Sequence, residues 1–119
     1  MAVEFDLTDR KVDEETHVIA VTGEIDLFTA PEFKQRISEL IDAGRSRLVV
    51  DLSETTFIDS SSLGVLIGAH RRLKLRGGAL LVVCDSEAIA KTFKITGLDG
   101  VFTLAGSVDD ALSDDASAA

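Results

Sequence analysis

Apolar and polar residues alternate near the start of the chain, and this pattern predicts two β-strands. Val3, Phe5 and Leu7 alternate with polar residues, as in a strand that buries one face. After an acidic turn at 13–16, residues 17–22 form a more continuously apolar strand. Because the connection is short, we expect the two strands to form an antiparallel hairpin.

A helix with clear start and stop signals follows the hairpin. Residues 23–26, Gly-Glu-Ile-Asp, lead out of the second strand. Thr29 with Glu32 three residues later predicts a capping box, and Pro31 lies in the first turn. Gly44 ends the helix. Its apolar stripe consists of Phe33, Ile37, Leu40 and Ile41.

The middle of the chain predicts a buried strand followed by a second helix. Residues 48–52 are almost wholly apolar, which is typical of a parallel strand covered on both faces. We expect residues 53–58 to be irregular, with Phe57 and Ile58 anchoring them to the core. The second helix should run over 61–76. Its buried side carries Leu63, Leu66, Ile67 and Leu73.

The last third predicts strands at 79–84 and 101–104. Between them, Asp85 or Ser86 can cap a third helix, and Gly97 stands where a left-handed C-cap is needed. Ser107 can cap a short fourth helix. We therefore expect one domain over residues 1–119, with a core at about 3–112 and a disordered tail at 113–119.

A hairpin followed by repeated strand and helix units predicts an α/β fold. We expect a mixed, mostly parallel sheet of about five strands, with right-handed crossovers and about four helices. In such sheets functional residues gather at the carboxyl ends of the strands. This predicts one edge lined with acids and hydroxyls: Glu24, Asp26, Asp51, Ser53, Asp59, Ser60, Asp85 and Ser86.

Composition narrows the possible partners. The formal net charge of −9 argues against nucleic acid and favours a basic protein partner. No apolar run approaches membrane-spanning length and the N-terminus lacks signal-peptide features, so we expect no membrane contact and a cytoplasmic location. A single Cys84 and two histidines predict neither a disulfide nor a metal site, and we expect no cofactor.

The motifs of common enzymes are missing from the sequence. It contains no Gly-x-x-x-x-Gly-Lys-Ser/Thr and no Gly-x-Gly-x-x-Gly, so a nucleotide-binding enzyme is not predicted. A hydrolase elbow needs glycines where Ile58 and Ser62 flank Ser60. Asp51 ends a predicted strand, but the acidic pair of a phosphoacceptor receiver domain is absent. We therefore predict that the chain is not an enzyme.

The most distinctive stretch is 57–68, in which an acid and three serines precede an amphipathic helix. A helix N-terminus offers free N–H groups and partial positive charge, which suit a capping oxygen or a phosphate. Capping is the commoner role for Asp and Ser before a helix. Three serines exceed what capping requires, so phosphate acceptance stays open beside it.

Several motifs occur in order and with similar spacing to one known family. They are Gly23-Glu24-Ile25-Asp26, Thr29-Ala30-Pro31, Asp51-Leu52-Ser53, Phe57-Ile58-Asp59-Ser60-Ser61, Leu63-Gly64-Val65, Gly77-Gly78 and Thr96-Gly97-Leu98. With these motifs the chain resembles the STAS domain family, specifically the bacterial anti-sigma-factor antagonists, over nearly its whole length.

The resemblance implies a switch between partners that acts in transcription, as in stress responses and sporulation. The unphosphorylated protein would bind an anti-sigma factor that is also a GHKL-type serine kinase, and so free a sigma factor. That kinase would phosphorylate Ser60, with Ser61 as second choice, and a PP2C-type phosphatase would reset the switch. The implied partner-binding residues are Glu24, Asp26, Asp59, Ser61, Ser62, Leu63 and Gly64.

Ser62 departs from the family pattern, which usually has glycine at this position. A side chain there is expected to crowd the kinase and adds a third candidate hydroxyl. Gly64 and Gly68 could allow close contact with a partner or close packing of their helix on the sheet. The alternative function is a STAS adaptor that is never phosphorylated and docks on a transporter ATPase or a signalling assembly.

Overall fold

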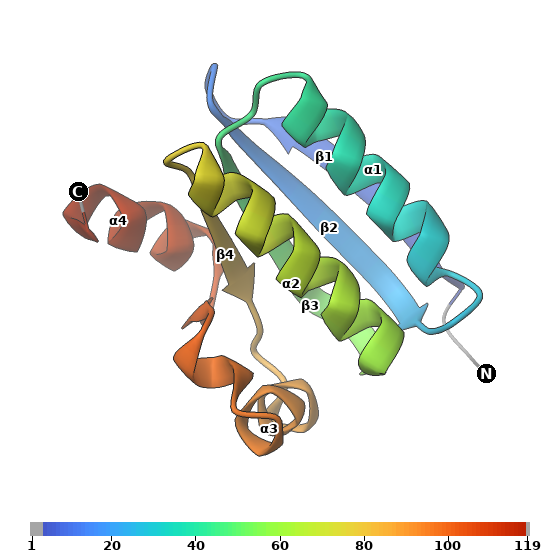
Figure 1. The fold of residues 1–119 in the computed structure, drawn as a ribbon. Helices are drawn as coiled ribbons and strands as arrows, with labels where there is room; N and C mark the ends of the chain where they lie inside the picture. The colour runs from blue at the N-terminus through green and yellow to red at the C-terminus, as the bar shows by residue number, and fades with distance from the viewer. Residues whose placement is uncertain (1–3, 119) are drawn as a thin grey trace.

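The computed structural model describes the backbone of residues 4–118 and the side chains of 4–113 (Figure 1). Its sheet has the strand order β1-β2-β3-β4-β5; β1 and β2 are antiparallel and the other neighbours are parallel. The predicted fold class is confirmed. The elements are β1 (Asp6–Lys11), β2 (Thr16–Ile25), α1 (Ala30–Asp42), β3 (Arg47–Ile58), α2 (Ser60–Leu75), β4 (Ala79–Val83), α3 (Glu87–Ile95), a 3-10 turn η1 (Leu98–Gly100), β5 (Thr103–Ala105) and α4 (Val108–Ala118).

The alternation of side chains along the central strands builds a core on each face of the sheet. On β3, Leu48, Val50 and Leu52 belong to the cluster that includes the buried residues of α1, α2 and α3. Val49 belongs to the second cluster, with Ala111 of α4. Figure 1 shows α1 and α2 side by side across one face. Among the described helices, none has the length and apolarity to cross a bilayer.

The ends of the chain differ in part from the sequence-based expectation. Strand β1 begins only at Asp6; Phe5 precedes it and packs against the core, while Val3 lies outside the described residues. Helix α4 runs past residue 112, where we expected the core to end. The disorder predicted for the tail at 113–119 stays a prediction about the protein in solution.

Strand β3 is longer than expected from the sequence. Residues 53–58 were expected to be irregular, but they continue the strand and pair with the end of β2, up to the pair Ile25 and Ile58. Ile58 is buried as expected, whereas Phe57 is 46% exposed and does not anchor the segment. Because β2 also extends to Ile25, residues 23–25 belong to the strand instead of leading out of it.

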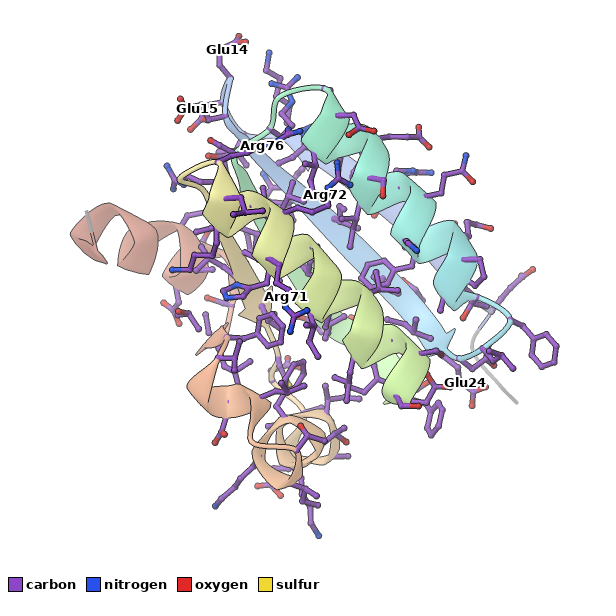
Figure 2. All side chains as sticks on the ribbon, viewed as in Figure 1. Glu14, Glu15, Glu24, Arg71, Arg72 and Arg76 are labelled. Carbon is purple, nitrogen blue, oxygen red and sulfur yellow. The ribbon has the colours of Figure 1, made fainter. Side chains whose placement is uncertain are left out.

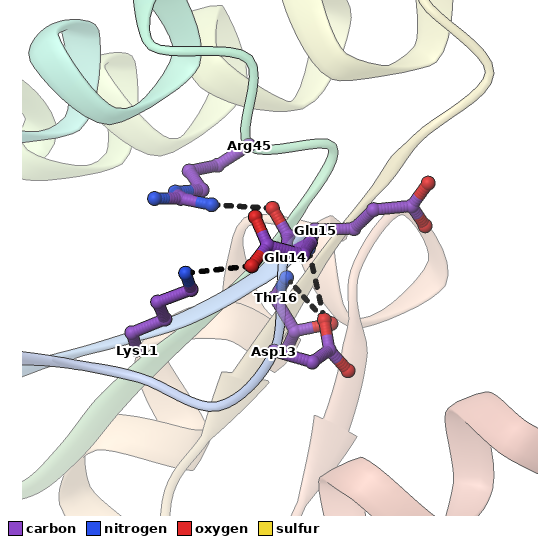
Figure 3. A network of polar contacts seen from close by, with 6 residues as sticks. All are labelled: Lys11, Asp13, Glu14, Glu15, Thr16 and Arg45. Carbon is purple, nitrogen blue, oxygen red and sulfur yellow. Dashed lines mark hydrogen bonds and ion pairs between the residues drawn. The ribbon is translucent and has the colours of Figure 1, made fainter.

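The predicted hairpin is confirmed, and its turn is tied to the loop before β3 (Figure 3). The Asp13 carboxylate accepts hydrogen bonds from the backbone N–H groups of Glu15 and Thr16, at 2.9 and 2.8 Å. Lys11 pairs with Glu14 at 3.0 Å, and the Arg45 guanidinium donates to the Glu14 carbonyl. The turn therefore stabilises the end of the sheet opposite to the starts of α1 and α2.

Gly78 is required by close contact between two loops, which leads to a prediction. A Cβ atom at this position would lie 2.0 Å from the backbone oxygen of Ser46. We expect Gly78→Ala to lower the free energy of unfolding by about 1 to 3 kcal/mol, as other overpacked sites do. Urea unfolding would measure the change. Gly68→Ala is the control, because a Cβ atom added at this position of α2 would have no neighbouring atom within 4 Å. An unchanged midpoint for Gly78→Ala would contradict the close approach.

Candidate functional site

The three serines at the start of α2 have very different surroundings. Ser60 is exposed, and its hydroxyl forms no hydrogen bond with any described residue. Ser61 is half-buried and donates to the Asp59 carboxylate at 2.5 Å. Ser62 is 0% exposed. Of the three hydroxyls, only that of Ser60 is both accessible and uncommitted.

Asp59 and Ser62 form a reciprocal capping box at the mouth of α2. The Asp59 carboxylate accepts from the Ser62 N–H at 3.1 Å, and the Ser62 hydroxyl accepts from the Asp59 N–H at 3.1 Å. The same hydroxyl donates to the Ile25 carbonyl at 2.6 Å, at the end of β2. Capping of the helix is therefore the role of Asp59 and Ser62, and it also joins α2 to the neighbouring strand.

The turn before α1 is held by a similar reciprocal pair of hydrogen bonds, and the predicted capping box of α1 is absent. Thr29 does not cap α1 with its side chain, so the expected box with Glu32 is wrong. Instead, the Asp26 carboxylate accepts from the Thr29 N–H at 3.1 Å, and the Thr29 hydroxyl accepts from the Asp26 N–H at 2.9 Å. That hydroxyl also lies 3.0 Å from the Glu24 carbonyl. Both helix entrances are thus anchored to adjacent carbonyls at the end of β2.

Exposed apolar side chains flank the acidic groups. Leu27 and Phe28, in the loop after β2, are 69% and 87% exposed. Phe57 belongs to the same end of the sheet, because it pairs with Glu24 across β2 and β3. None of these three residues was predicted to belong to the site, although Leu27 and Phe28 form an apolar pair in a loop between a strand end and a helix start. They give the site an apolar component.

A groove begins beside the serines and lies between the first turns of α1 and α2. It encloses about 400 Å³. Gly64 is exposed to this space, and a Cβ atom added to it or to Gly68 would touch nothing within 4 Å. These glycines therefore do not pack their helix against the sheet. The groove is lined by Leu27, Ala30, Pro31, Lys34, Ser61, Gly64 and Val65.

The structure brings together only part of the predicted edge. Glu24, Asp26, Asp59 and Ser60 meet where β2 and β3 end. Asp51 lies in the middle of β3 and pairs with the last residue of β4. Ser53, and the residues Asp85 and Ser86 that follow β4, therefore lie away from the end of β3 where Asp59 and Ser60 are found. Ile58 follows Asp51 by seven positions along β3, or about 23 Å at 3.3 Å per residue. The expectation of a single acidic edge that includes Asp51, Ser53, Asp85 and Ser86 is wrong.

Two predicted partner-binding residues are not at the surface. Ser62 and Leu63 are both buried, so neither side chain is available for direct contact with a partner in this conformation. Ser62 therefore cannot crowd a kinase with its own side chain or serve as an accessible third hydroxyl. Glu24, by contrast, is exposed, and Figure 2 shows it where α1 and α2 begin, far from Arg72 and Arg76 at the other end.

Neither histidine is placed to activate a serine. His17 is buried and hydrogen-bonds with Asp9 at 2.9 Å through Nε2. His70 packs edge-on against Phe102, with ring centroids 5.3 Å apart. Among the described side chains, those of residues 4–113, no group of three or more His, Cys, Asp or Glu is arranged to hold a metal ion. The site can present a hydroxyl to another protein, and no described side chain accepts a hydrogen bond from the Ser60 hydroxyl as an activating base would.

Hydrogen bonds make the site sensitive to acid. The bond from the Ser61 hydroxyl, helped by the Ser62 N–H and opposed in part by desolvation, lowers the pKa of Asp59 from its usual 3.8. A lowered pKa means that the charged cap stabilises the fold above pH 3.8 and that this contribution is lost as pH falls through the folded-state pKa.

Asp59→Ala should therefore cost about 1 kcal/mol of unfolding free energy at pH 7, as for other N-caps. The difference from wild type should shrink below pH 3.8, where the wild-type carboxylate becomes protonated. Urea unfolding of both proteins at pH 7 and in acid would measure it. A difference that is independent of pH would show that the charge of Asp59 does not support the cap.

Comparisons with known proteins agree with one another. The family model of the STAS domain matches residues 8–111. An anti-sigma-B factor antagonist of Listeria monocytogenes is 32% identical over 105 residues, covering 87% of this chain and 90% of the relative. An anti-sigma factor antagonist from Mycobacterium paratuberculosis has a similar structure, with a TM-score of 0.82, 30% identity and coverage of 95% and 93% of the two chains.

The anti-sigma factor antagonist SpoIIAA of Bacillus is similar in both of its solved forms. Its unphosphorylated form matches with a TM-score of 0.80 and 26% identity, covering 96% of this chain and 97% of SpoIIAA. Its phosphorylated form matches with a TM-score of 0.72 and 27% identity, covering 93% and 98%. The strand order, the match of the family model and these relatives lead to one conclusion: the chain belongs to the STAS domain family.

Proposed function

We propose that this chain is an anti-sigma-factor antagonist whose binding is controlled by phosphorylation of Ser60. In its unphosphorylated form it binds an anti-sigma factor that is also a GHKL-type serine kinase, and a sigma factor is released. Phosphorylation ends the complex, and a PP2C-type phosphatase restores the free hydroxyl. The protein acts in the cytoplasm as the substrate of this chemistry, and not as its catalyst.

The observation that carries the proposal is the isolation of the Ser60 hydroxyl. It is exposed at a helix entrance, while its two neighbours are held in hydrogen bonds. Among the described side chains, none accepts a hydrogen bond from the Ser60 hydroxyl, as the base of a hydrolytic enzyme would. Support also comes from SpoIIAA, a family member that exists in phosphorylated and unphosphorylated forms.

The phosphoryl transfer requires only the free hydroxyl from this chain. The Ser60 oxygen attacks the γ-phosphorus of ATP bound to the kinase and forms the new P–O bond. The bond from that phosphorus to the bridging oxygen breaks and ADP leaves, while the hydroxyl proton passes to a base of the kinase. This chain supplies the position of the oxygen, which the first turn of α2 holds at the protein surface.

Charge explains the release of the partner. A phosphate adds about −1.5 to −2 charges at pH 7, beside the acidic residues Glu24, Asp26 and Asp59. The helix N-terminus offers limited compensation, because the Asp59 carboxylate already accepts the Ser62 N–H. Because Ser60 is exposed, the new charge faces outward, at the surface on which the apolar side chains of Leu27 and Phe28 are also exposed. We expect it to weaken the interface without refolding the domain.

A competition assay tests the proposed function. Candidate GHKL-type kinases encoded in the same genome are purified and bound to sigma factors. This chain is then added with or without ATP. We expect release of sigma by the unmodified chain and loss of that release after phosphorylation. Ser60→Ala should release sigma under both conditions. The proposal is wrong if the unmodified chain releases sigma from none of the kinases. It is also wrong if Ser60→Ala, like wild type, no longer releases sigma after incubation with ATP.

A further inference from the structure

Three consecutive serines open α2, and a kinase that reaches this turn meets three hydroxyls within a few ångströms. We propose that Asp59, together with Ser62, selects Ser60 as the phosphoacceptor by holding the other two hydroxyls in hydrogen bonds. The inference rests on the proposed function, because it concerns which hydroxyl of that site is modified. Asp59 and Ser62 are positioning residues, since neither touches ATP.

Ser61 is withheld by a charged acceptor. Its hydroxyl proton is directed at the Asp59 Oδ1 atom, 2.5 Å from the Ser61 oxygen. Before Ser61 can turn toward a kinase, this bond must break, and a hydrogen bond to a charged group corresponds to roughly a tenfold to hundredfold change in an equilibrium. The bond therefore lowers the fraction of Ser61 that is free to react.

The same carboxylate is a poor base for activating Ser61. Its Oδ1 atom also accepts from the Ser62 N–H at 3.1 Å and lies 3.0 Å from the Ser62 hydroxyl. An oxygen that already accepts several hydrogen bonds in its charged form gains little from taking a proton. Asp59 therefore restrains Ser61 and does not increase its nucleophilicity.

Ser62 is withheld by burial and by a bond to another strand. Its side chain is 0% exposed, and its hydroxyl donates to the Ile25 carbonyl at 2.6 Å. The oxygen also accepts from the Asp59 N–H at 3.1 Å. A kinase could reach it only if the first turn of α2 separated from β2. Burial thus excludes Ser62, and its two bonds hold that turn in place.

The bonds that restrain Ser61 and Ser62 also present Ser60. Asp59 has the extended backbone of an N-cap, with φ −129° and ψ −172°, and Ser60 is the first helical residue after it. Because Ser62 joins this turn to the end of β2, the Ser60 side chain leaves the surface from a rigid backbone. Selection then follows from which hydroxyl is free and does not require the kinase to recognise three serines separately.

Phosphosite mapping in a Ser60→Ala background tests the selection. Each variant is incubated with the purified GHKL-type kinase that phosphorylates wild type and with ATP, and the phosphate on Ser61 is quantified by mass spectrometry. Attack by the Ser61 oxygen forms the new P–O bond, ADP leaves, and the proton goes to the kinase base. We expect little phosphate on Ser61 in Ser60→Ala. In the double variant Ser60→Ala/Asp59→Ala, the phosphate on Ser61 should rise about tenfold or more.

Two further variants sharpen the comparison. Asp59→Asn keeps an oxygen that can accept from the Ser61 hydroxyl, but without charge, so we expect a smaller rise in Ser61 phosphate than with Asp59→Ala. Ser86→Ala is the matched control: Ser86 also caps a helix through its side chain, but at α3. In the Ser60→Ala background this variant should leave Ser61 unmodified, because a general loss of helix capping does not free that hydroxyl.

A measurement without kinase keeps the inference testable if the Asp59 variants bind the kinase poorly. In NMR spectra of the wild-type protein, we expect slow exchange of the Ser61 and Ser62 hydroxyl protons and fast exchange of the Ser60 proton. In Asp59→Ala the Ser61 proton should exchange about tenfold or more faster. Ser86→Ala should change none of the three.

The possible failures are distinguishable. If wild type carries no phosphate on any of the three serines with any candidate kinase, the proposed function fails. If wild type is modified on Ser60 but Ser60→Ala is labelled on Ser61 at a similar rate, only the inference fails. Equally fast exchange of the Ser60 and Ser61 hydroxyl protons in wild type would overturn it without reference to a kinase.

Discussion

Ser60→Asp is expected to weaken binding to the anti-sigma kinase severalfold to about a thousandfold. Two unit charges 4 Å apart interact by roughly 1 kcal/mol in water and about 4 kcal/mol at an effective dielectric constant of 20, and every 1.4 kcal/mol changes affinity about tenfold. The new carboxylate would add to the acidic residues Glu24, Asp26 and Asp59 at the same surface. Titration calorimetry with the purified kinase would measure the change.

Two variants show whether the position of the charge matters. Ser60→Ala should bind about as well as wild type, since it adds no charge. Ser113→Asp places the same charge on an exposed residue of α4, a helix that packs on the sheet face opposite to α2, and should leave affinity unchanged. Equal loss of affinity for Ser60→Asp and Ser113→Asp would mean that net charge, and not the charge at this site, controls binding.

Phe28→Ala is expected to lower affinity for the kinase by roughly tenfold to a hundredfold. The Phe28 ring is 87% exposed in the free protein. Covering such a side chain in an interface would contribute about 1.5 to 3 kcal/mol to the free energy of binding. Aromatic residues are enriched at the buried centres of interfaces. We therefore infer that a partner covers Phe28, and surface plasmon resonance would measure the loss of affinity.

The stability of this variant provides the internal check. Because Phe28 contributes little to the folded core, Phe28→Ala should change the free energy of unfolding by no more than about 0.5 kcal/mol. The matched control is Leu75→Ala: Leu75 is 89% exposed, but it lies at the opposite end of α2. Unchanged affinity for Phe28→Ala, or an equal loss for Leu75→Ala, would place the interface elsewhere.

The helices could be predicted from the sequence because their signals are local. Gly97 has a φ of +76°, as the predicted left-handed C-cap requires, and Ser86 caps α3. The length of β3 could not be predicted in the same way. Residues 53–56 are polar, and they are extended because they pair with β2, a contact between segments far apart in sequence. This error also misplaced Asp51 relative to Asp59.

The candidate site was predicted in outline but not in its internal roles. Ser60 was predicted as the phosphoacceptor from the family resemblance, and its hydroxyl is the exposed one of the three. The burial of Ser62 could not be predicted, because it depends on a hydrogen bond to Ile25, which lies 37 residues away in the sequence. The Asp-x-x-Ser/Thr spacing was present in the sequence both in the capping box at 59–62 and in the turn at 26–29 before α1.

Phosphosite mapping of the wild-type protein tests the central claim most directly. The protein is incubated with the purified GHKL-type kinase and ATP, digested, and analysed by tandem mass spectrometry. We predict a single phosphate on Ser60, with Ser61 and Ser62 unmodified. A protein that gains no phosphate, or that gains it elsewhere while Ser60 stays unmodified, would contradict the account.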